Sequence, residues 1–245
     1  MRQTRLYLDG DYDSGSELEI DAEKTHYLSR VLRLRVGDTI VIFNGTGAQF
    51  SASIAALQRS RGTLAVHDAL AAATESGFKL HLAQGISRGE RMDFVVQKAT
   101  ELGVKRITPL LTEHGVVKLT AERAEKRQRH WRQVATSACE QSGRVRLPLV
   151  DAPVRLDTWL ADKTHQADTD ILLKPGASEG LASIDMPATR VCLLIGPEGG
   201  FSEAEYAMTE LAGFRAVSFG PRVLRTETAA IAALAVLQAR CGDLN

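Results

Sequence analysis

The stretch that decides the fold lies near the C-terminal end and reads Leu193-Leu194-Ile195-Gly196-Pro197-Glu198-Gly199-Gly200-Phe201-Ser202, here called the first motif. The apolar run Val191–Ile195 leads into it and is typical of a strand buried on both faces of a sheet. The strand ends before Pro197, because proline has no N–H to donate to a sheet. Ser202 and Glu205 then match a capping box, which predicts the start of a helix.

The turn of the first motif has the composition of a ligand-binding loop. Gly199 and Gly200 lack a Cβ atom, so a ligand can approach the backbone closely. A helix start can bind phosphate through its N–H groups, but Glu198 lies in the turn and no lysine follows it, unlike in a P-loop. The turn therefore favours a neutral or cationic ligand, and a tight strand–helix turn without a ligand is the alternative interpretation.

A second motif follows at Phe219-Gly220-Pro221-Arg222-Val223-Leu224-Arg225-Thr226-Glu227-Thr228. The helix predicted over 228–240 is small and apolar nearly all round, so we expect it to be buried, in part at a subunit interface. Burying a charged side chain at the start of such a helix costs free energy unless the side chain pairs or binds a ligand. Three charged residues lie there, namely Arg222, Arg225 and Glu227. Ligands of open α/β sheets bind at the carboxyl ends of strands, so the two motifs are expected to line one pocket.

Together the two motifs resemble the SPOUT-class methyltransferases and, within that class, the RsmE family of 16S rRNA (uracil-N3)-methyltransferases. The resemblance covers essentially the whole chain. Four shorter segments agree with the same family, namely Val31–Arg33, Ser87–Met92, Gln97–Val104 and Ala138–Arg144.

The resemblance implies an α/β fold. Its main domain would be a SPOUT-type knotted, mostly parallel sheet with helices on both faces, preceded by a small PUA-like β-barrel domain. It also implies a homodimer that uses S-adenosylmethionine (SAM) to methylate N3 of one uridine in 16S rRNA, within the 30S subunit. One alternative is a SPOUT methyltransferase acting on a different rRNA or tRNA nucleotide. A second is a non-catalytic RNA-binding factor for ribosome assembly.

The residue roles follow from the chemistry that the family implies. Because SAM carries an activated methyl group, the protein mainly has to position the reactants. Arg225 is expected to stabilise negative charge on the uracil, and Glu198 or Glu227 to accept the N3 proton or to hold Arg225. A third strand end, Lys174-Pro175-Gly176, is expected to form another wall of the pocket. The expected cofactor contacts are Leu173, Leu194, Ile195, Gly196, Glu198, Gly199, Gly200, Phe219, Gly220, Val223, Leu224 and Thr226.

The charge balance bears on RNA binding. The formal net charge of the chain is zero, which argues against a general nucleic-acid coat protein but leaves room for local basic clusters. For each arginine in such a cluster, a solvated surface position is the alternative interpretation. The arginines expected to contact RNA are Arg30, Arg33, Arg88, Arg91, Arg144 and Arg222.

Patterning divides the chain into two parts. Residues 1–72 contain several short strand patterns and a hairpin turn at Asn44–Gly47, which predicts a small barrel. A small, polar stretch at 71–77 has the composition of a linker. Alternating strand and helix patterns follow, which predict a parallel sheet. We therefore predict a PUA-like RNA-binding domain over 1–72 and a methyltransferase domain over 73–245.

Composition excludes several other classes of protein. The three cysteines, Cys139, Cys192 and Cys241, are widely spaced without a C-x-x-C pair, so neither a zinc site nor a disulfide framework is predicted. No apolar run approaches the roughly 20 residues that span a bilayer. The residues after Met1 do not form the apolar stretch of a secretory signal. A cytoplasmic protein without a metal ion or membrane partner is expected.

Overall fold

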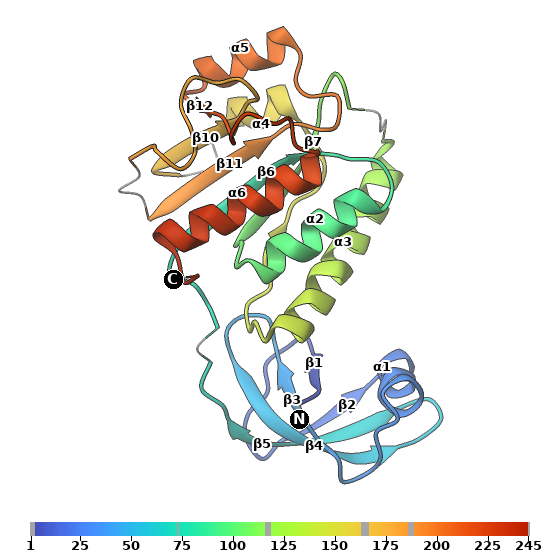
Figure 1. Ribbon diagram of the computed structural model, residues 1–245. Coiled ribbons are helices and arrows are strands. Elements are labelled where there is room, and N and C mark those ends of the chain that lie inside the picture. The colour runs from blue at the N-terminus through green and yellow to red at the C-terminus, as the bar shows by residue number, and fades with distance from the viewer. Residues whose placement is uncertain (1–2, 73, 116–118, 163–166, 186–188, 245) are drawn as a thin grey trace. The chain divides into compact units, whose positions relative to one another are not determined.

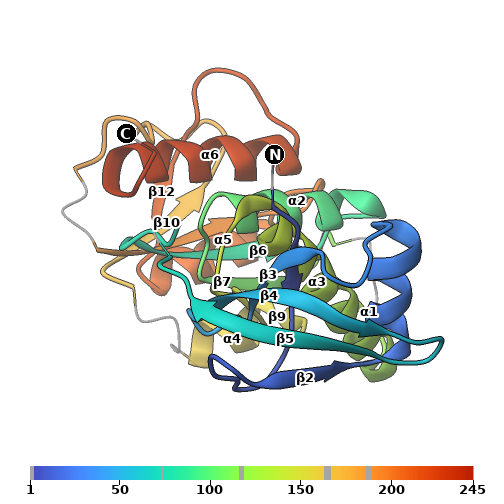
Figure 2. The same cartoon turned by 90° about the horizontal axis from the view of Figure 1, so that it is seen from below.

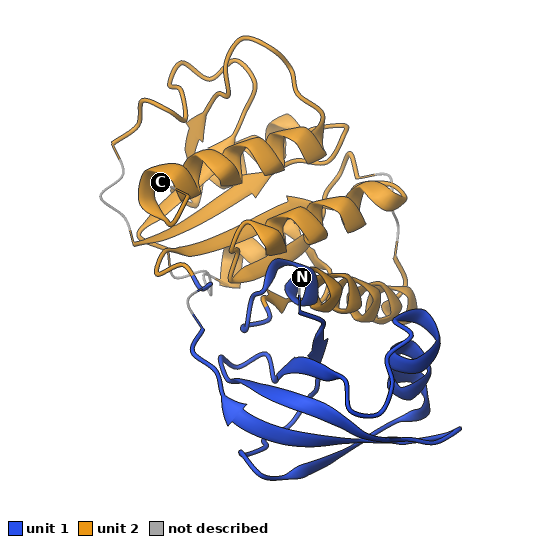
Figure 3. Ribbon diagram, turned by 60° about the horizontal axis from the view of Figure 1, so that its bottom comes forward, with its two compact units in different colours: residues 1–75, 139–147 blue, residues 76–138, 148–245 orange. Residues whose placement is uncertain are grey.

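The computed structural model describes residues 3–72, 74–115, 119–162, 167–185 and 189–244. The chain forms two compact units (Figure 3). Unit 1 comprises Met1–Glu75 and Cys139–Leu147, and unit 2 comprises Ser76–Ala138 and Pro148–Asn245. The boundary at residue 72 between an RNA-binding domain and a methyltransferase domain stays a prediction.

Unit 1 is built on a mixed, half-barrel sheet in the order β1-β3-β4-β5-β2, in which β1 runs parallel to β3 and the other pairs are antiparallel. Ile40 and Ile42 of β3 are fully buried in its core. The predicted turn after β3 forms, and the Asn44 side chain accepts a hydrogen bond from the Thr46 backbone N–H at 3.0 Å. The strands are β1 Arg5–Tyr7, β2 Glu17–Ile20, β3 Thr39–Phe43, β4 Gln49–Leu57 and β5 Gly62–Ala69.

A short helix lies between β2 and β3. Asp21 caps α1, Ala22–His26, by accepting the Lys24 N–H at 2.8 Å, and one π-helical turn, η1, continues over Tyr27–Val31. The chain leaves the helix after Val31, and Arg33 takes a left-handed φ of 57°. Such a φ is uncommon for a residue with a Cβ atom.

Unit 2 is built on a parallel sheet in the order β12-β10-β11-β6-β7-β8, with β9 also paired to β7. The strand order puts β11 between β10 and β6, so β11 pairs with a strand that lies about a hundred residues earlier in the chain as well as with the strand just before it. The carboxyl ends of β10, β11, β12 and β6 therefore lie on one edge of the sheet. The strands are β6 Lys79–Gly85, β7 Arg106–Leu111, β8 Leu149–Val150, β9 Val154–Arg155, β10 Thr169–Leu173, β11 Arg190–Ile195 and β12 Arg215–Val217.

Helices cover both faces of this sheet (Figures 1 and 2). Val191, Leu193 and Ile195 of β11 pack in the core that includes α2, α3 and α6, whereas Cys192 and Leu194 pack in the core that includes α4 and α5. The prediction of a strand buried on both faces is confirmed, as is the fold class, while the knot stays a prediction. The helices are α2 Glu90–Glu101, α3 Ala121–Ser142, α4 Leu156–Asp162, α5 Glu203–Leu211 and α6 Thr226–Cys241.

Candidate active site

A cavity of about 600 Å³ opens in unit 2 at the carboxyl ends of β10, β11 and β12. Both motifs line it, so they share one hollow as the sequence predicts. All of the expected cofactor contacts line the cavity except Leu194, whose side chain is buried in the core on the α4–α5 face. The lining residues are Arg91, Leu173, Lys174, Pro175, Gly176, Ile195, Gly196, Pro197, Glu198, Gly199, Gly200, Phe201, Tyr206, Phe219, Gly220, Pro221, Arg222, Val223, Leu224, Arg225, Thr226 and Ala229.

The first motif leaves β11 in a turn that depends on its glycines. Gly200 takes a φ of 67°, and its N–H donates to the Pro197 carbonyl at 2.9 Å. A Cβ atom on Gly196 would lie 3.3 Å from the Gly200 Cα atom and from the Phe201 ring. A Cβ atom on Gly199 would lie 3.0 Å from the His114 carbonyl oxygen. A side chain at Gly196 or Gly199 would therefore crowd its neighbours, and without one the backbone at these positions borders the cavity directly.

The predicted capping box at the start of α5 is confirmed. The Glu205 backbone N–H donates to the Ser202 hydroxyl at 3.2 Å, and the Ser202 N–H donates to the Glu205 carboxylate at 2.9 Å. The second oxygen of Glu205 accepts the Glu113 N–H at 2.8 Å, so this carboxylate also binds the loop after β7. Together these contacts fix where the first motif enters the helix.

A buried glutamine connects the two motifs beneath the cavity. The Gln84 side-chain amide, at the end of β6, donates to the Thr226 hydroxyl at 2.9 Å and to the Gly196 carbonyl at 3.3 Å. The Thr226 hydroxyl donates to the same carbonyl at 2.7 Å. Thr226 was expected to contact the cofactor, but its hydroxyl is occupied in this network. Sequence analysis missed Gln84, although a polar residue inside an apolar strand is a signal that could have pointed to it.

Glu198 is held by the chain segment that follows β6. Its carboxylate accepts the Arg88 backbone N–H at 3.1 Å and the Arg91 guanidinium at 2.8 Å. Burial acts to raise the pKa of Glu198, but hydrogen bonds from its own N–H, from Arg88 and from Arg91 outweigh burial and lower it. Glu198 is therefore a carboxylate at neutral pH, and its partner is Arg91 rather than the expected Arg225.

The charged side chains of the second motif form no ion pair with any residue that the structure describes. Arg225 is the N-cap residue of α6, but its side chain makes no capping hydrogen bond, and no ion pair involves it among the described residues. Arg222 and Val223 are exposed. Glu227 does not line the cavity, and within the described part of the chain its buried Oε2 atom has no hydrogen-bond partner. The expected Glu227–Arg225 contact is thus not seen between these residues.

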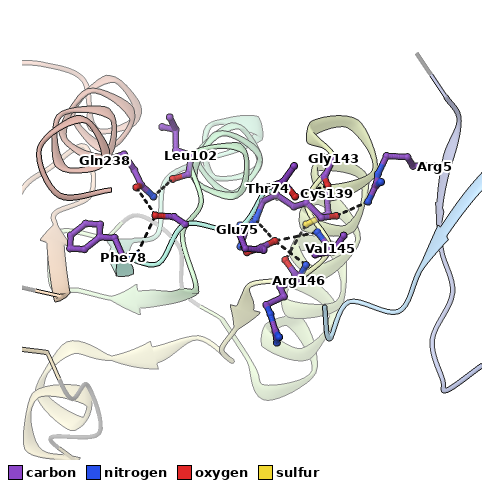
Figure 4. A network of polar contacts seen from close by, with 12 residues as sticks. Arg5, Thr74, Glu75, Phe78, Leu102, Cys139, Gly143, Val145, Arg146 and Gln238 are labelled. Atoms are coloured by element: carbon purple, nitrogen blue, oxygen red, sulfur yellow. Dashed lines mark hydrogen bonds and ion pairs between the residues drawn. The ribbon is translucent and has the colours of Figure 1, made fainter. Parts of the chain in front are cut away.

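The arginines of unit 1 differ sharply in exposure. Arg30 and Arg33 are exposed around the end of the short helix. Arg144 is only 2% exposed and donates to the Glu75 carboxylate. The same carboxylate also accepts the Val145 and Arg146 N–H groups (Figure 4). The Arg144 guanidinium is therefore enclosed in the fold, and burial leaves it little surface for RNA.

The described residues lack two kinds of feature. None of their helices is both long and apolar enough to cross a membrane. Nor do they contain a group of three or more His, Cys, Asp or Glu side chains arranged to hold a metal ion.

Burial raises the pKa of Cys139 to about 12 and raises that of Cys192, so both thiols stay protonated and unreactive at neutral pH.

Comparison with known proteins places this geometry in a family. The RNA methyltransferase domain matches residues 74–238, and the RNA methyltransferase PUA domain matches residues 20–66. Ribosomal RNA small subunit methyltransferase E of Buchnera aphidicola subsp. Schizaphis graminum is 34% identical over 244 residues, covering 100% of this chain and 99% of the relative. The protein of the same name from Bacillus subtilis is 29% identical, covering 89% and 88% of the two chains.

Two solved structures are similar over their whole length. A Legionella pneumophila protein in complex with the cofactor SAM is 42% identical with a TM-score of 0.94, covering 100% of both chains. Ribosomal RNA small subunit methyltransferase E from Neisseria gonorrhoeae, bound to S-adenosyl methionine, is 35% identical with a TM-score of 0.92, again covering 100% of both. With the two motifs sharing one glycine-lined cavity, the chain belongs to the RNA methyltransferase family, among the ribosomal RNA small subunit methyltransferases E.

Proposed function

We propose that this chain is a SAM-dependent methyltransferase that methylates N3 of one uridine in the 16S rRNA of the small ribosomal subunit. The observation that carries the proposal is the single cavity formed by both motifs, with the Arg225 guanidinium in its wall and no ion pair to it from the residues that the structure describes. The two SAM-bound structures that this chain resembles at 42% and 35% identity support the choice of cofactor.

The cavity suits SAM in size and in lining. Its volume of about 600 Å³ lies within the range of roughly 300–1,000 Å³ that is usual for small-molecule sites. The backbone at Gly196, Gly199 and Gly200 borders the cavity and offers the adenosine those N–H and C=O groups that the turn itself does not use, and Leu173, Ile195 and Leu224 provide apolar contact. The remaining proposed contacts are Glu198, Phe219, Gly220 and Val223, with Leu194 offering only its backbone.

The charges in the wall fit methyl transfer to a uracil nitrogen. When bound, SAM supplies a methyl group made electrophilic by a sulfonium centre. Glu198, kept ionised by Arg91, places a negative charge beside that cation. Arg225 stabilises the negative charge that develops on the uracil oxygens as the N3 proton is lost. Glu198 is a poor base because its pKa is lowered, and the catalytic role of Glu227 stays a prediction.

RNA contact is proposed on both units. In unit 2, the exposed Arg88 and Arg222 lie beside the cavity, where phosphates flanking the target uridine would pass. In unit 1, Arg30 and Arg33 are exposed on the segment matched by the PUA domain. The proposed division is thus an RNA-binding domain over 1–72 and a methyltransferase domain over 73–245.

The assembly is also a proposal. One side of α6 keeps the apolar residues Ile231, Ala232, Ala235 and Val236 only half-buried, which supports a homodimer that covers them. A trefoil knot in unit 2, the 30S subunit as substrate and a cytoplasmic location complete the proposal. Light scattering coupled to gel filtration measures the dimer directly, and a monomer mass at micromolar concentration argues against it.

The function is tested by transfer of radiolabelled methyl groups. Purified protein is incubated with labelled SAM and, side by side, with 30S subunits and naked 16S rRNA from a strain that lacks the modification. We expect label in the RNA, and nucleoside mass analysis to identify 3-methyluridine. Label at another nucleotide would change the substrate, and SAM binding without any transfer would favour an RNA-binding assembly factor.

A further inference from the structure

Lys174 lines the cavity at a position that the fold fixes firmly. It is the first residue after β10, and its side chain is half-buried in the cavity wall. Its backbone N–H donates to the Val217 carbonyl of β12 at 2.8 Å, and its own carbonyl accepts the Ala177 N–H at 3.3 Å. Gly176 completes the turn with a φ of 76°. The Cα atom of Lys174 is thus held on both sides.

The side chain of Lys174 is fixed as well, by an aromatic ring. Its Nζ atom lies 4.3 Å from the centroid of the Tyr206 ring, within the range of a cation–π contact. Tyr206 is itself held edge-on by the Phe201 ring, with centroids 5.7 Å apart. Burial raises the pKa of Tyr206, so the ring is a neutral phenol at neutral pH. The ammonium group is therefore pre-positioned before any ligand binds.

This ammonium group lies next to the first motif. A Cβ atom built on Gly200 would have the Tyr206 hydroxyl oxygen, 3.9 Å away, as its nearest neighbour. Lys174, Tyr206 and Gly200 thus meet at one place in the wall, from β10, α5 and the turn after β11. Among the charged residues of the lining, Arg91 is paired with Glu198, but no ion pair to Lys174 occurs in the described residues.

We propose that Lys174, held by Tyr206, binds the carboxylate at the amino-acid end of SAM. This inference rests on the proposed function, because it assigns one end of the proposed cofactor. That end carries a carboxylate, which needs a cationic partner. The ammonium and the sulfonium close to it are positively charged and need none. Lys174 follows β10 and supplies this cation, whereas Glu198 is bound by the segment after β6 and supplies the negative charge; β11 lies between these two strands.

A small carboxylate fits this position better than an RNA phosphate. Phosphates of an RNA strand run along the surface, where the exposed Arg222 can meet them. Lys174 is half-buried in the cavity wall with its Nζ atom over the Tyr206 ring, so its ammonium reaches a ligand that has entered the cavity. An unpaired ammonium held in a partly dry wall makes a stronger contact with a carboxylate than a freely hydrated one does.

The test removes either the ammonium of Lys174 or the carboxylate of the ligand. Isothermal titration calorimetry on the full-length protein compares S-adenosylhomocysteine, which has the amino-acid end, with 5′-methylthioadenosine, which lacks it. Lys174→Met keeps the stem and loses the ammonium, and Lys174→Arg restores a cation. Lys126→Met, on the exposed face of α3, is the matched control.

We expect Lys174→Met to bind S-adenosylhomocysteine about tenfold more weakly, the order of one hydrogen bond to a charged group, and 5′-methylthioadenosine within twofold of wild type. Lys174→Arg should recover most of the loss. An equal loss for both ligands would mean a structural role and overturn the inference. Unchanged cofactor affinity with a raised KM for 30S subunits would assign Lys174 to RNA and also overturn it. If wild-type protein binds neither ligand, the proposed function fails first.

Discussion

Unit 1 and unit 2 each contain an arginine–glutamate pair, and the two pairs are opposites. The Arg144–Glu75 pair of unit 1 has side chains only 3% and 16% exposed, and Glu75 also accepts two backbone N–H groups (Figure 4). The Arg91–Glu198 pair of unit 2 has side chains 45% and 24% exposed and borders the cavity. A buried charge depends on its partner, whereas a half-exposed one is screened by water. Burial thus distinguishes Arg144, whose ion pair stabilises the fold, from Arg91, whose ion pair sets the charge at the edge of the cavity.

The largest effect is expected from breaking the buried pair. Glu75→Gln leaves the Arg144 guanidinium buried without its counter-charge, and this should lower the free energy of unfolding by about 3–5 kcal/mol. Urea unfolding followed by circular dichroism measures it. The matched control is Glu125→Gln, which removes an exposed pair on α3, with Arg129 at 3.9 Å, and should cost no more than about 0.5 kcal/mol. A loss below 1 kcal/mol for Glu75→Gln would contradict the role given to burial.

The cavity arginine Arg225 should matter for rate rather than for stability. Arg225→Ala is expected to lower kcat by about 10²–10³, the usual effect of removing one group that stabilises developing negative charge. Unfolding and SAM affinity should change little, because no ion pair of Arg225 is present in the described residues. Single-turnover methyl transfer and calorimetry measure the two effects.

The neighbouring Arg222 is the matched control for that prediction. Arg222→Ala removes an equally exposed guanidinium from the same motif. It should raise KM for the RNA and leave kcat within a few fold of wild type. If the two variants lose kcat equally, the motif acts only through its total charge.

Local patterns predicted most of the secondary structure and both motifs. The capping box at Ser202 needs only residues three apart, and the strand Val191–Ile195 shows its burial in its own composition. Such features depend on neighbours in the chain, so the sequence displays them. The same holds for the turn glycines, because a φ of 67° at Gly200 is a property of one residue.

Contacts between distant segments could not be predicted in this way. Arg91 precedes Glu198 by 107 residues, and Gln84 precedes Thr226 by 142, so no periodicity connects them. Arg144 looked like a surface arginine, because nothing near it shows that residues 139–147 belong to unit 1. These positions depend on which strands lie side by side, and that order is set by the whole chain.

Breaking the buried hydrogen bonds of Gln84 should lower the free energy of unfolding by an amount between the losses expected for the two ion pairs. Gln84→Met keeps the side-chain volume but leaves the Gly196 carbonyl and Thr226 hydroxyl without the amide donor. A lost buried hydrogen bond costs about 1–3 kcal/mol, so we expect that loss in unfolding free energy and a weaker affinity for SAM. A double-mutant cycle with Thr226→Val should show a coupling of about 1 kcal/mol. Additive effects would mean that the two side chains do not act as one connection.

The smallest effect is expected from the half-exposed pair, and its pH dependence identifies it. The pKa of Glu198 in the folded protein lies below its ordinary value of 4.5. Its contribution to stability is therefore fully present above about pH 4.5 and is lost as the pH falls through the folded pKa. Glu198→Gln should lower the free energy of unfolding by less than about 1 kcal/mol at pH 7, and this gap should close as the pH falls from 4.5 through the lowered pKa of the folded protein. Urea unfolding of both proteins across that range measures the gap. A gap that stays constant with pH would show that the side chain acts through packing, and Arg91 would then be no more than a neighbour of the cavity.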